Sequence, residues 1–233
     1  MIEAYNWPTS NGRKIFIMLE EAGLPYTIHP VNINKGDQFK PEFLEISPNN
    51  KIPAIVDTDG PGGKPISIFE SGATLIYLAK KARSPLFPAD EAQQYKVLSW
   101  LFMQVGHVGP TFGQVQHFLA RAQEGGGDYA LQRFTKETNR IYGVLDRRLG
   151  EADYLAGEYS VADIAVFPWT QGHEKQGQRL SDYPNVKRWF RAIRERPAVQ
   201  KALTVAADMR RANRPLTEEA RAIMFGDKQY ERR

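Results

Sequence analysis

The sequence predicts two domains, a small α/β domain followed by an all-helical domain. Strand-like and helix-like stretches alternate from the N-terminus to about residue 81. Strand signals then stop at a proline-flanked stretch, residues 84–88, and apolar residues recur beyond it with helical spacing. We therefore expect domains at residues 1–84 and 90–205, and a C-terminal extension at 206–233.

The composition is that of a soluble globular protein, with 42% hydrophobic and 25% charged residues among 233. No uninterrupted apolar run approaches the roughly 20 residues that span a bilayer, and the N-terminus lacks a basic signal region. We therefore expect a cytoplasmic protein. The net charge is +4, but residues 206–233 mix both signs, which indicates a solvated tail and no nucleic-acid or membrane partner.

The chain contains no cysteine. Disulfides, thiolate metal ligands and a protein thiol nucleophile are therefore excluded. The four histidines lie at scattered positions, so no metal site is expected. Any thiol chemistry must come from a bound ligand.

The first domain is predicted to run in the order strand, helix, strand, short helix, two strands, helix. The expected strands are residues 1–4, 26–31, 52–57 and 66–69. The first helix ends near Gly23 and Pro25, the short helix begins at Pro41, and the last begins at Glu70 and Ser71. A βαβ half followed by a ββα half is a thioredoxin-like layout.

The second domain is predicted to consist of helices alone. A long helix over residues 91–122 should be interrupted at residues 106–110, and a second covers residues 129–149. Ser160 and Asp163 form a capping box that opens an apolar helix. Two further helices begin at Pro184 and Pro197.

The turn within residues 5–14 is the feature around which the first domain is organised. Thr9, Ser10 and Asn11 stand between a strand and a helix whose apolar face includes Ile15 and Met18. Free backbone N–H groups and partial positive charge at such a helix start suit an anion. Taken alone, the three polar residues indicate only a helix cap.

Four motifs together make the chain resemble the glutathione transferase superfamily. They are residues 8–12 (Pro-Thr-Ser-Asn-Gly), 46–57 (with Ser-Pro-Asn-Asn-Lys-Ile-Pro-Ala-Ile), 69–73 (Phe-Glu-Ser-Gly-Ala) and 160–165 (Ser-Val-Ala-Asp-Ile-Ala). Within the superfamily, the chain resembles the Nu-class and yeast nitrogen-regulator-like group, which includes bacterial glutathione-dependent disulfide-bond oxidoreductases. The resemblance covers residues 1–205 and implies the glutathione transferase architecture and a homodimer.

The resemblance also implies how glutathione is held. The Ile52–Pro53 bond is expected to be cis, and the Ile52 backbone is expected to pair with the cysteinyl backbone. Ser71, at a helix start, should hold the γ-glutamyl carboxylate, and Glu70 the γ-glutamyl ammonium. Further glutathione contacts are implied for Gln38, Lys51 and Arg133.

The resemblance places the glutathione thiol at the first turn, where Thr9 or Asn11 is the expected thiolate donor and Ser10 a third candidate. A free thiol has a pKa of about 8.5. Lowering that pKa by ~2 units requires about 2.7 kcal/mol of selective thiolate stabilisation. Hydrogen bonds and a helix start are of this order.

These assignments imply a glutathione-dependent disulfide-bond oxidoreductase in which bound glutathione supplies the missing thiol. Its partners would be small-molecule thiols and disulfides, with two glutathiones or oxidised glutathione in a site, and peroxidase or transferase activity could accompany it. Two alternatives stay open. One is a conventional transferase that conjugates electrophiles, and the other is a non-enzymatic glutathione-binding regulatory module.

Overall fold

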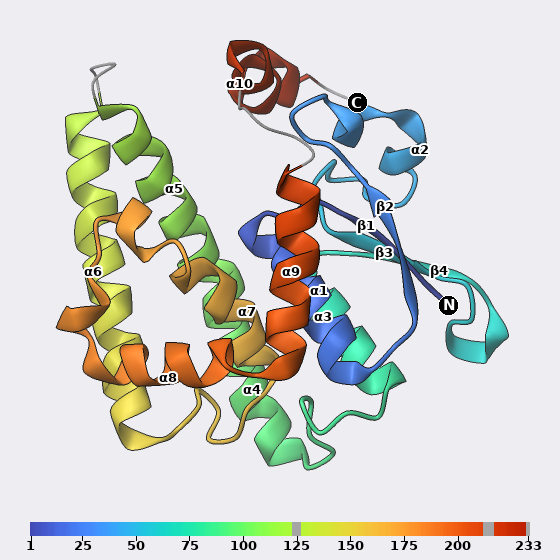
Figure 1. The fold of residues 1–233 in the computed structure, drawn as a ribbon, viewed down its shortest axis with the longest axis horizontal. Helices are drawn as coiled ribbons and strands as arrows, with labels where there is room; N and C mark the ends of the chain where they lie inside the picture. Colours follow the sequence, from blue (N-terminus) through green and yellow to red (C-terminus); the bar gives the residue numbers. More distant parts are fainter. Residues whose placement is uncertain (123–126, 212–216, 232–233) are drawn as a thin grey trace. The chain divides into compact units, whose positions relative to one another are not determined.

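The computed structural model of the chain describes residues 1–122, 127–211 and 217–231. It divides into two compact units, Met1–Leu78 with Lys201–Arg233, and Ala79–Gln200 (Figure 1). The C-terminal segment therefore groups with the N-terminal unit. The domain boundaries expected from the sequence, 1–84, 90–205 and 206–233, stay a prediction.

The first unit is built on a mixed four-stranded sheet in the order β2-β1-β3-β4. Its strands are β1 (Ile2–Asn6), β2 (Tyr26–Pro30), β3 (Ala54–Asp57) and β4 (Ile66–Phe69). β1 runs parallel to β2 and antiparallel to β3, and β3 is antiparallel to β4. This topology confirms the predicted thioredoxin-like fold.

Two helices connect strands of this sheet, α1 (Ser10–Ala22) between β1 and β2 and α2 (Pro41–Leu44) between β2 and β3, and α3 (Ser71–Lys81) follows β4. α1 and α3 lie on one face of the sheet (Figure 1). Thr9 caps the start of α1, and Gly23, with a φ of 62°, caps its end in the left-handed region where glycine is favoured. The predicted start and stop signals of this helix are confirmed.

The third strand was predicted two residues too long. It was expected from Ile52, but the ladder with β4 begins at the pair Ala54 and Phe69. Pro53 has no backbone N–H to donate to a ladder, so the strand begins after it. The backbone of Ile52 consequently lies ahead of the ladder.

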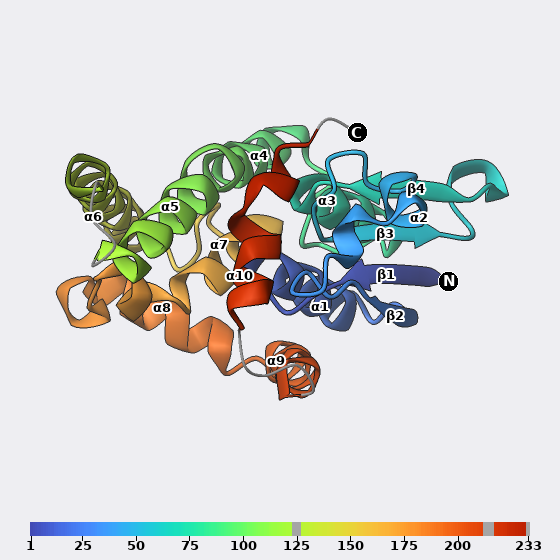
Figure 2. The same ribbon diagram turned by 90° about the horizontal axis from the view of Figure 1, so that it is seen from above.

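The second unit is helical, as predicted. It contains α4 (Glu91–Met103), α5 (Gly109–Ala120), α6 (Asp128–Glu151), α7 (Val161–Thr170) and α8 (Pro184–Arg194). A π-helical segment, Gln104–Val108, joins α4 to α5 at the predicted interruption. α5 and α6 lie side by side (Figure 2). Phe112 of α5 stacks on Tyr142 of α6 at a centroid distance of 4.9 Å.

The described residues after residue 206 contain helical structure. α9 (Pro197–Arg211) lies beside α1, where Lys201 pairs with Glu20 at 2.7 Å. Beyond it, α10 (Glu218–Phe225) begins at the Thr217 cap and buries Ala220. Most other residues of α10 are exposed, as expected of a solvated segment, but Ala220 is buried. Nowhere in the described residues is a helix long and apolar enough to cross a membrane.

The predicted capping box at the start of α7 is present, and its Asp163 also bonds to other segments of the second unit. Asp163 is completely buried and accepts hydrogen bonds from the Ser160 backbone (3.0 Å) and hydroxyl (3.2 Å). It also accepts from the Leu155 backbone (3.0 Å) and from the Trp189 indole (2.8 Å). Burial raises the pKa of Asp163 to about 6, while these donors oppose the shift.

Replacing Asp163 by alanine should lower the free energy of unfolding by about 3 kcal/mol, because the Trp189 and Leu155 N–H groups lose their buried acceptor. Urea denaturation followed by tryptophan fluorescence measures this change. Glu151→Ala is the control, since Glu151 is exposed and its pair with Arg148 is 3.3 Å long. Equal stabilities of the two variants would contradict the role given to Asp163.

Candidate functional site

Three separate segments of the first unit meet at a pocket of about 190 Å³. The pocket lies where α1 begins, where the loop before β3 ends, and where β4 passes into α3. Nine residues line it: Asn11, Ser47, Asn49, Lys51, Ile52, Pro53, Phe69, Glu70 and Ser71. Six of the residues predicted from the sequence are among them, and their roles toward a ligand stay predictions.

A tight turn between β1 and α1 positions Asn11 at this pocket. The buried Asn6 side chain donates to the Gly12 carbonyl (2.9 Å) and accepts from the Trp7 backbone N–H (2.8 Å). A Cβ on Gly12 would lie 1.8 Å from the Trp7 carbonyl oxygen. Only glycine therefore fits at position 12, which belongs to the first of the four motifs, whereas the role of Asn6 was not predicted.

Thr9 is the N-cap of α1, where its Oγ1 accepts a hydrogen bond from the Gly12 backbone N–H at 3.1 Å. A hydroxyl that accepts one bond can still donate its own proton. Capping and thiolate donation are therefore compatible at Thr9. Thr9 is half-buried and is not among the residues that line the pocket.

The loop before β3 is closed by its own hydrogen bonds. The Ser47 hydroxyl donates to the Lys51 carbonyl (2.9 Å), and the Asn50 backbone N–H donates to the Ser47 carbonyl (2.9 Å). The next peptide bond, Ile52–Pro53, is cis, as expected. These hydrogen bonds fix the backbone of the loop, and Ile52 and Pro53 at its end line the pocket.

Glu70 stands at the start of α3 in an unusual backbone conformation. Its φ is 66°, in the left-handed region that non-glycine residues seldom occupy. Thr74 stabilises this arrangement, because both its backbone N–H (2.9 Å) and its hydroxyl (3.0 Å) donate to the Glu70 carbonyl. Such a conformation costs about 1–3 kcal/mol and is most frequent at functional sites. The Glu70 carboxylate is exposed and accepts from Asn49 at 3.5 Å.

A buried lysine that was not among the predicted site residues contacts Ser71, which lines the pocket. Lys14 is 1% exposed, and its Nζ donates to the Ser71 hydroxyl oxygen at 3.0 Å. Burial lowers the pKa of Lys14 to about 7, while the nearby Glu70 carboxylate acts in the opposite direction. One signal could have located it: Lys14 stands four residues before Met18, on the apolar face of α1.

Lys51 contacts the C-terminal segment. Its Nζ donates to Gln229 Oε1 at 2.8 Å, and Gln229 belongs to a short 3-10 turn after α10. The loss of hydration around its ammonium lowers the pKa of Lys51. The motifs did not extend to the tail, so the sequence could not predict this contact.

Gln38 lies outside the residues that line the pocket. Its side chain is 3% exposed, and Nε2 donates to the Ile33 carbonyl at 3.5 Å. Within the described part of the chain, Gln38 Oε1 is buried and has no hydrogen-bond partner. An amide oxygen in this state could accept a hydrogen bond from a ligand.

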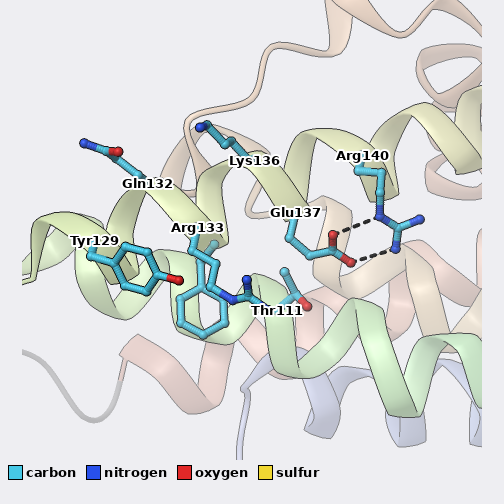
Figure 3. A pocket seen from close by; sticks show the side chains of 8 residues that line it. Thr111, Tyr129, Gln132, Arg133, Lys136, Glu137 and Arg140 are labelled. Atoms are coloured by element: carbon cyan, nitrogen blue, oxygen red, sulfur yellow. Dashed lines mark hydrogen bonds and ion pairs between the residues drawn. The ribbon is translucent and has the colours of Figure 1, made fainter.

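Arg133 belongs to the second unit. It lines a hollow of about 580 Å³ between α5 and α6, and its side chain extends toward Thr111 (Figure 3). Glu137 and Arg140 form a two-bond ion pair nearby, at 2.6 and 2.8 Å. The predicted contact of Arg133 with glutathione stays a prediction.

The polar groups at this pocket suit an anion. The start of α3 offers backbone N–H groups, Ser71 a hydroxyl, and Lys51 and Lys14 positive charge. Across the described ranges, no group of three or more His, Asp or Glu side chains is arranged to hold a metal ion.

Residues 10–81 match the family described as the glutathione S-transferase N-terminal domain, and residues 108–197 match its C-terminal domain. The chain is 50% identical over 209 residues to the disulfide-bond oxidoreductase YfcG of Escherichia coli K12, covering 88% of this chain and 96% of that protein.

Two solved structures are similar along most of their length. One is a glutathione transferase family member from Pseudomonas fluorescens Pf-5 with two glutathiones bound (TM-score 0.81, 45% identity, 87% of this chain and 92% of that chain). The other is a glutathione transferase from Pseudomonas putida with one glutathione disulfide per subunit (TM-score 0.82, 44% identity, 88% and 91%).

The chain therefore belongs to the glutathione S-transferase family. Its similarity to a bacterial disulfide-bond oxidoreductase confirms the resemblance inferred from the motifs.

Because a Cβ at residue 12, in the first turn of α1, would collide with the Trp7 carbonyl, Gly12→Ala should lower the free energy of unfolding by about 3 kcal/mol and abolish ligand binding at the pocket. Thermal unfolding and titration calorimetry measure the two effects. Gly143→Ala is the matched control, since a Cβ there meets no atom within 4 Å and helix interiors favour alanine by about 0.5–1 kcal/mol. Similar behaviour of the two variants would argue against the close approach at Gly12.

Proposed function

We propose that this protein is a glutathione-dependent disulfide-bond oxidoreductase. The observation that carries the proposal is the convergence of Asn11, Ile52 with its cis proline, and Glu70 with Ser71 on one pocket, in a chain without cysteine. Because the protein has no thiol of its own, bound glutathione must supply the nucleophile.

The proposed reaction is two successive thiol–disulfide exchanges. The thiolate of bound glutathione attacks one sulfur of the substrate disulfide, forms a glutathione mixed disulfide and releases the other sulfur as a thiolate, which takes up a proton. The thiolate of a second glutathione then attacks the glutathione sulfur of the mixed disulfide, giving glutathione disulfide and a second substrate thiol. Two glutathiones are oxidised for each disulfide reduced.

The first step requires a thiolate, and the start of α1 is proposed to stabilise it. The Thr9 hydroxyl proton and the Asn11 amide are donors at this helix start, and the helix adds partial positive charge. Hydrogen bonds to a charged acceptor contribute about 1.5–3 kcal/mol each. At the upper end of this range one such bond accounts for the ~2-unit decrease in thiol pKa considered above, and at the lower end two bonds are needed.

The rest of glutathione is proposed to follow the pocket. The Ile52 backbone, which precedes the β3 ladder, pairs with the cysteinyl residue. Ser71 and the start of α3 hold the γ-glutamyl carboxylate, and Glu70 holds the ammonium. Gln38 and Lys51 are proposed for the glycine end, and Arg133 as a further contact.

Two of the similar structures support a site that holds two tripeptides. One contains two glutathiones and the other contains one glutathione disulfide per subunit. A pair of glutathione units is what the second exchange requires. We therefore propose that this site also accommodates two glutathiones or one glutathione disulfide.

Asn11→Ala and Thr9→Ala should each lower the rate of glutathione-dependent reduction of a small dialkyl disulfide by at least about tenfold, because the thiolate loses a donor. The rate of NADPH consumption in a coupled glutathione reductase assay measures this. Thr9→Ser, which keeps the hydroxyl, should retain most of the activity. Wild-type rates in both alanine variants would rule out the assigned donors.

Asp90→Ala controls for the lost helix cap. Asp90 caps α4 in the other unit by accepting from the Gln93 N–H at 2.9 Å, so both substitutions remove one cap worth about 1 kcal/mol. Only Thr9→Ala should lower activity. The same protein assayed with a halogenated aromatic acceptor tests the alternative: conjugation faster than disulfide reduction would favour a conventional transferase.

We further propose that the protein acts in the cytoplasm as a homodimer. Tyr95 and Phe102 support an interface, since they lie seven residues apart on α4 and are 63% and 66% exposed. Residues at this spacing share a helix face, and exposed aromatic side chains are enriched at protein interfaces. Light scattering coupled to size-exclusion chromatography should give twice the chain mass of 26.4 kDa. A monomeric mass would contradict the dimer.

A further inference from the structure

A fully buried lysine stands behind the proposed glutathione site. Lys14 lies in the second turn of α1, and only 1% of it is exposed. Lysine is almost never buried to this degree without compensation, because its ammonium loses its hydration. Lys14 lies outside the four motifs that carry the family resemblance, and it is not among the nine residues that line the pocket. A buried charge of this kind calls for a functional or structural explanation.

The contact of Lys14 with Ser71 restricts how the serine hydroxyl can point. A lysine ammonium has three donors and no acceptor. At 3.0 Å from Lys14 Nζ, the Ser71 oxygen therefore acts as the acceptor. The hydroxyl proton of Ser71 is then not used in this bond, and Ser71 is one of the residues that line the pocket. Ser71 can therefore donate its proton to a ligand bound there.

The charge of Lys14 also favours an anion at this place. Glu70, at the start of α3, is the charged group whose field acts on Lys14 and favours its protonated form. Burial opposes this and lowers the pKa of Lys14 to about 7. A carboxylate bound at Ser71 would be a second negative charge within range of the ammonium, and opposite charges at such distances stabilise each other.

We propose that Lys14 is a positioning residue for the γ-glutamyl carboxylate of glutathione, acting from behind Ser71 by orienting the serine hydroxyl and by adding buried positive charge. The inference rests on the proposed function, because it takes glutathione as the ligand. It separates the carboxylate end of the ligand, which depends on Lys14, from the thiol end, which depends on Thr9 and Asn11.

A purely structural role of Lys14 predicts a different effect of its replacement on ligand binding. If Lys14 only joined α1 to α3, its replacement would loosen the whole pocket and weaken every ligand equally. Replacement of a buried charge by an apolar side chain of similar size is often neutral or stabilising. Lys14→Met should therefore fold at least as stably as the native protein while it recognises one group of the ligand poorly.

The test compares two ligands on the full chain by titration calorimetry. The first is glutathione, and the second is γ-aminobutyryl-cysteinyl-glycine, which lacks only the γ-glutamyl carboxylate. Lys14→Met should weaken glutathione binding by about tenfold or more and change binding of the analogue by less than about twofold. In disulfide reduction, KM for glutathione should rise by a similar factor while kcat stays within about twofold of the native value.

Two further variants complete the test. Lys64→Met removes an exposed lysine of the same unit and should change neither ligand's affinity. Ser71→Ala should reproduce the selective loss of glutathione binding, which keeps the proposal testable if Lys14→Met does not fold. Equal loss of both ligands, or unchanged glutathione binding in folded Lys14→Met, would overturn the role of Lys14. A native protein that binds no glutathione would instead refute the proposed function.

Discussion

The tight turn between β1 and α1 is the constraint on which the site depends. The Gly12 backbone approaches the Trp7 carbonyl so closely that no Cβ fits at residue 12. The buried Asn6 side chain donates a hydrogen bond to the Gly12 carbonyl and accepts one from the Trp7 backbone N–H. This geometry sets where α1 begins and in which direction its first residues face. Asn6, Trp7 and Gly12 therefore position Thr9 and Asn11, the two proposed thiolate donors.

A second constraint joins α1 to α3. The bond from Lys14 to Ser71 connects residues 57 positions apart and brings the starts of the two helices to one pocket. Glu70 completes this junction in a left-handed conformation that Thr74 stabilises. The proposed thiolate and carboxylate subsites thus belong to one hydrogen-bonded structure, which holds both ends of an extended ligand at a defined separation.

Much of the site was predictable because its residues carry local signals. Lys51, Ile52 and Pro53 stand in dense turn chemistry, and Glu70 and Ser71 stand at a helix start. Asn6, Lys14 and Gln229 were not predicted. An asparagine at the end of a strand and a lysine in a helix carry no signal that distinguishes them in the sequence. What distinguishes Asn6 and Lys14 is their burial, and what distinguishes Lys14 and Gln229 is a bond to a residue far along the chain.

The sequence by itself determined the order of the elements, the helix caps and the absence of a protein thiol, because hydrophobic periodicity, capping residues and composition act over a few positions. Only the tertiary structure decided that Lys14 lies buried beneath Ser71, that Gly12 touches Trp7, and that Gln229 reaches Lys51 across 178 positions. The physical reason is that burial, close approach and desolvation arise only when distant segments pack together, so no local pattern encodes them.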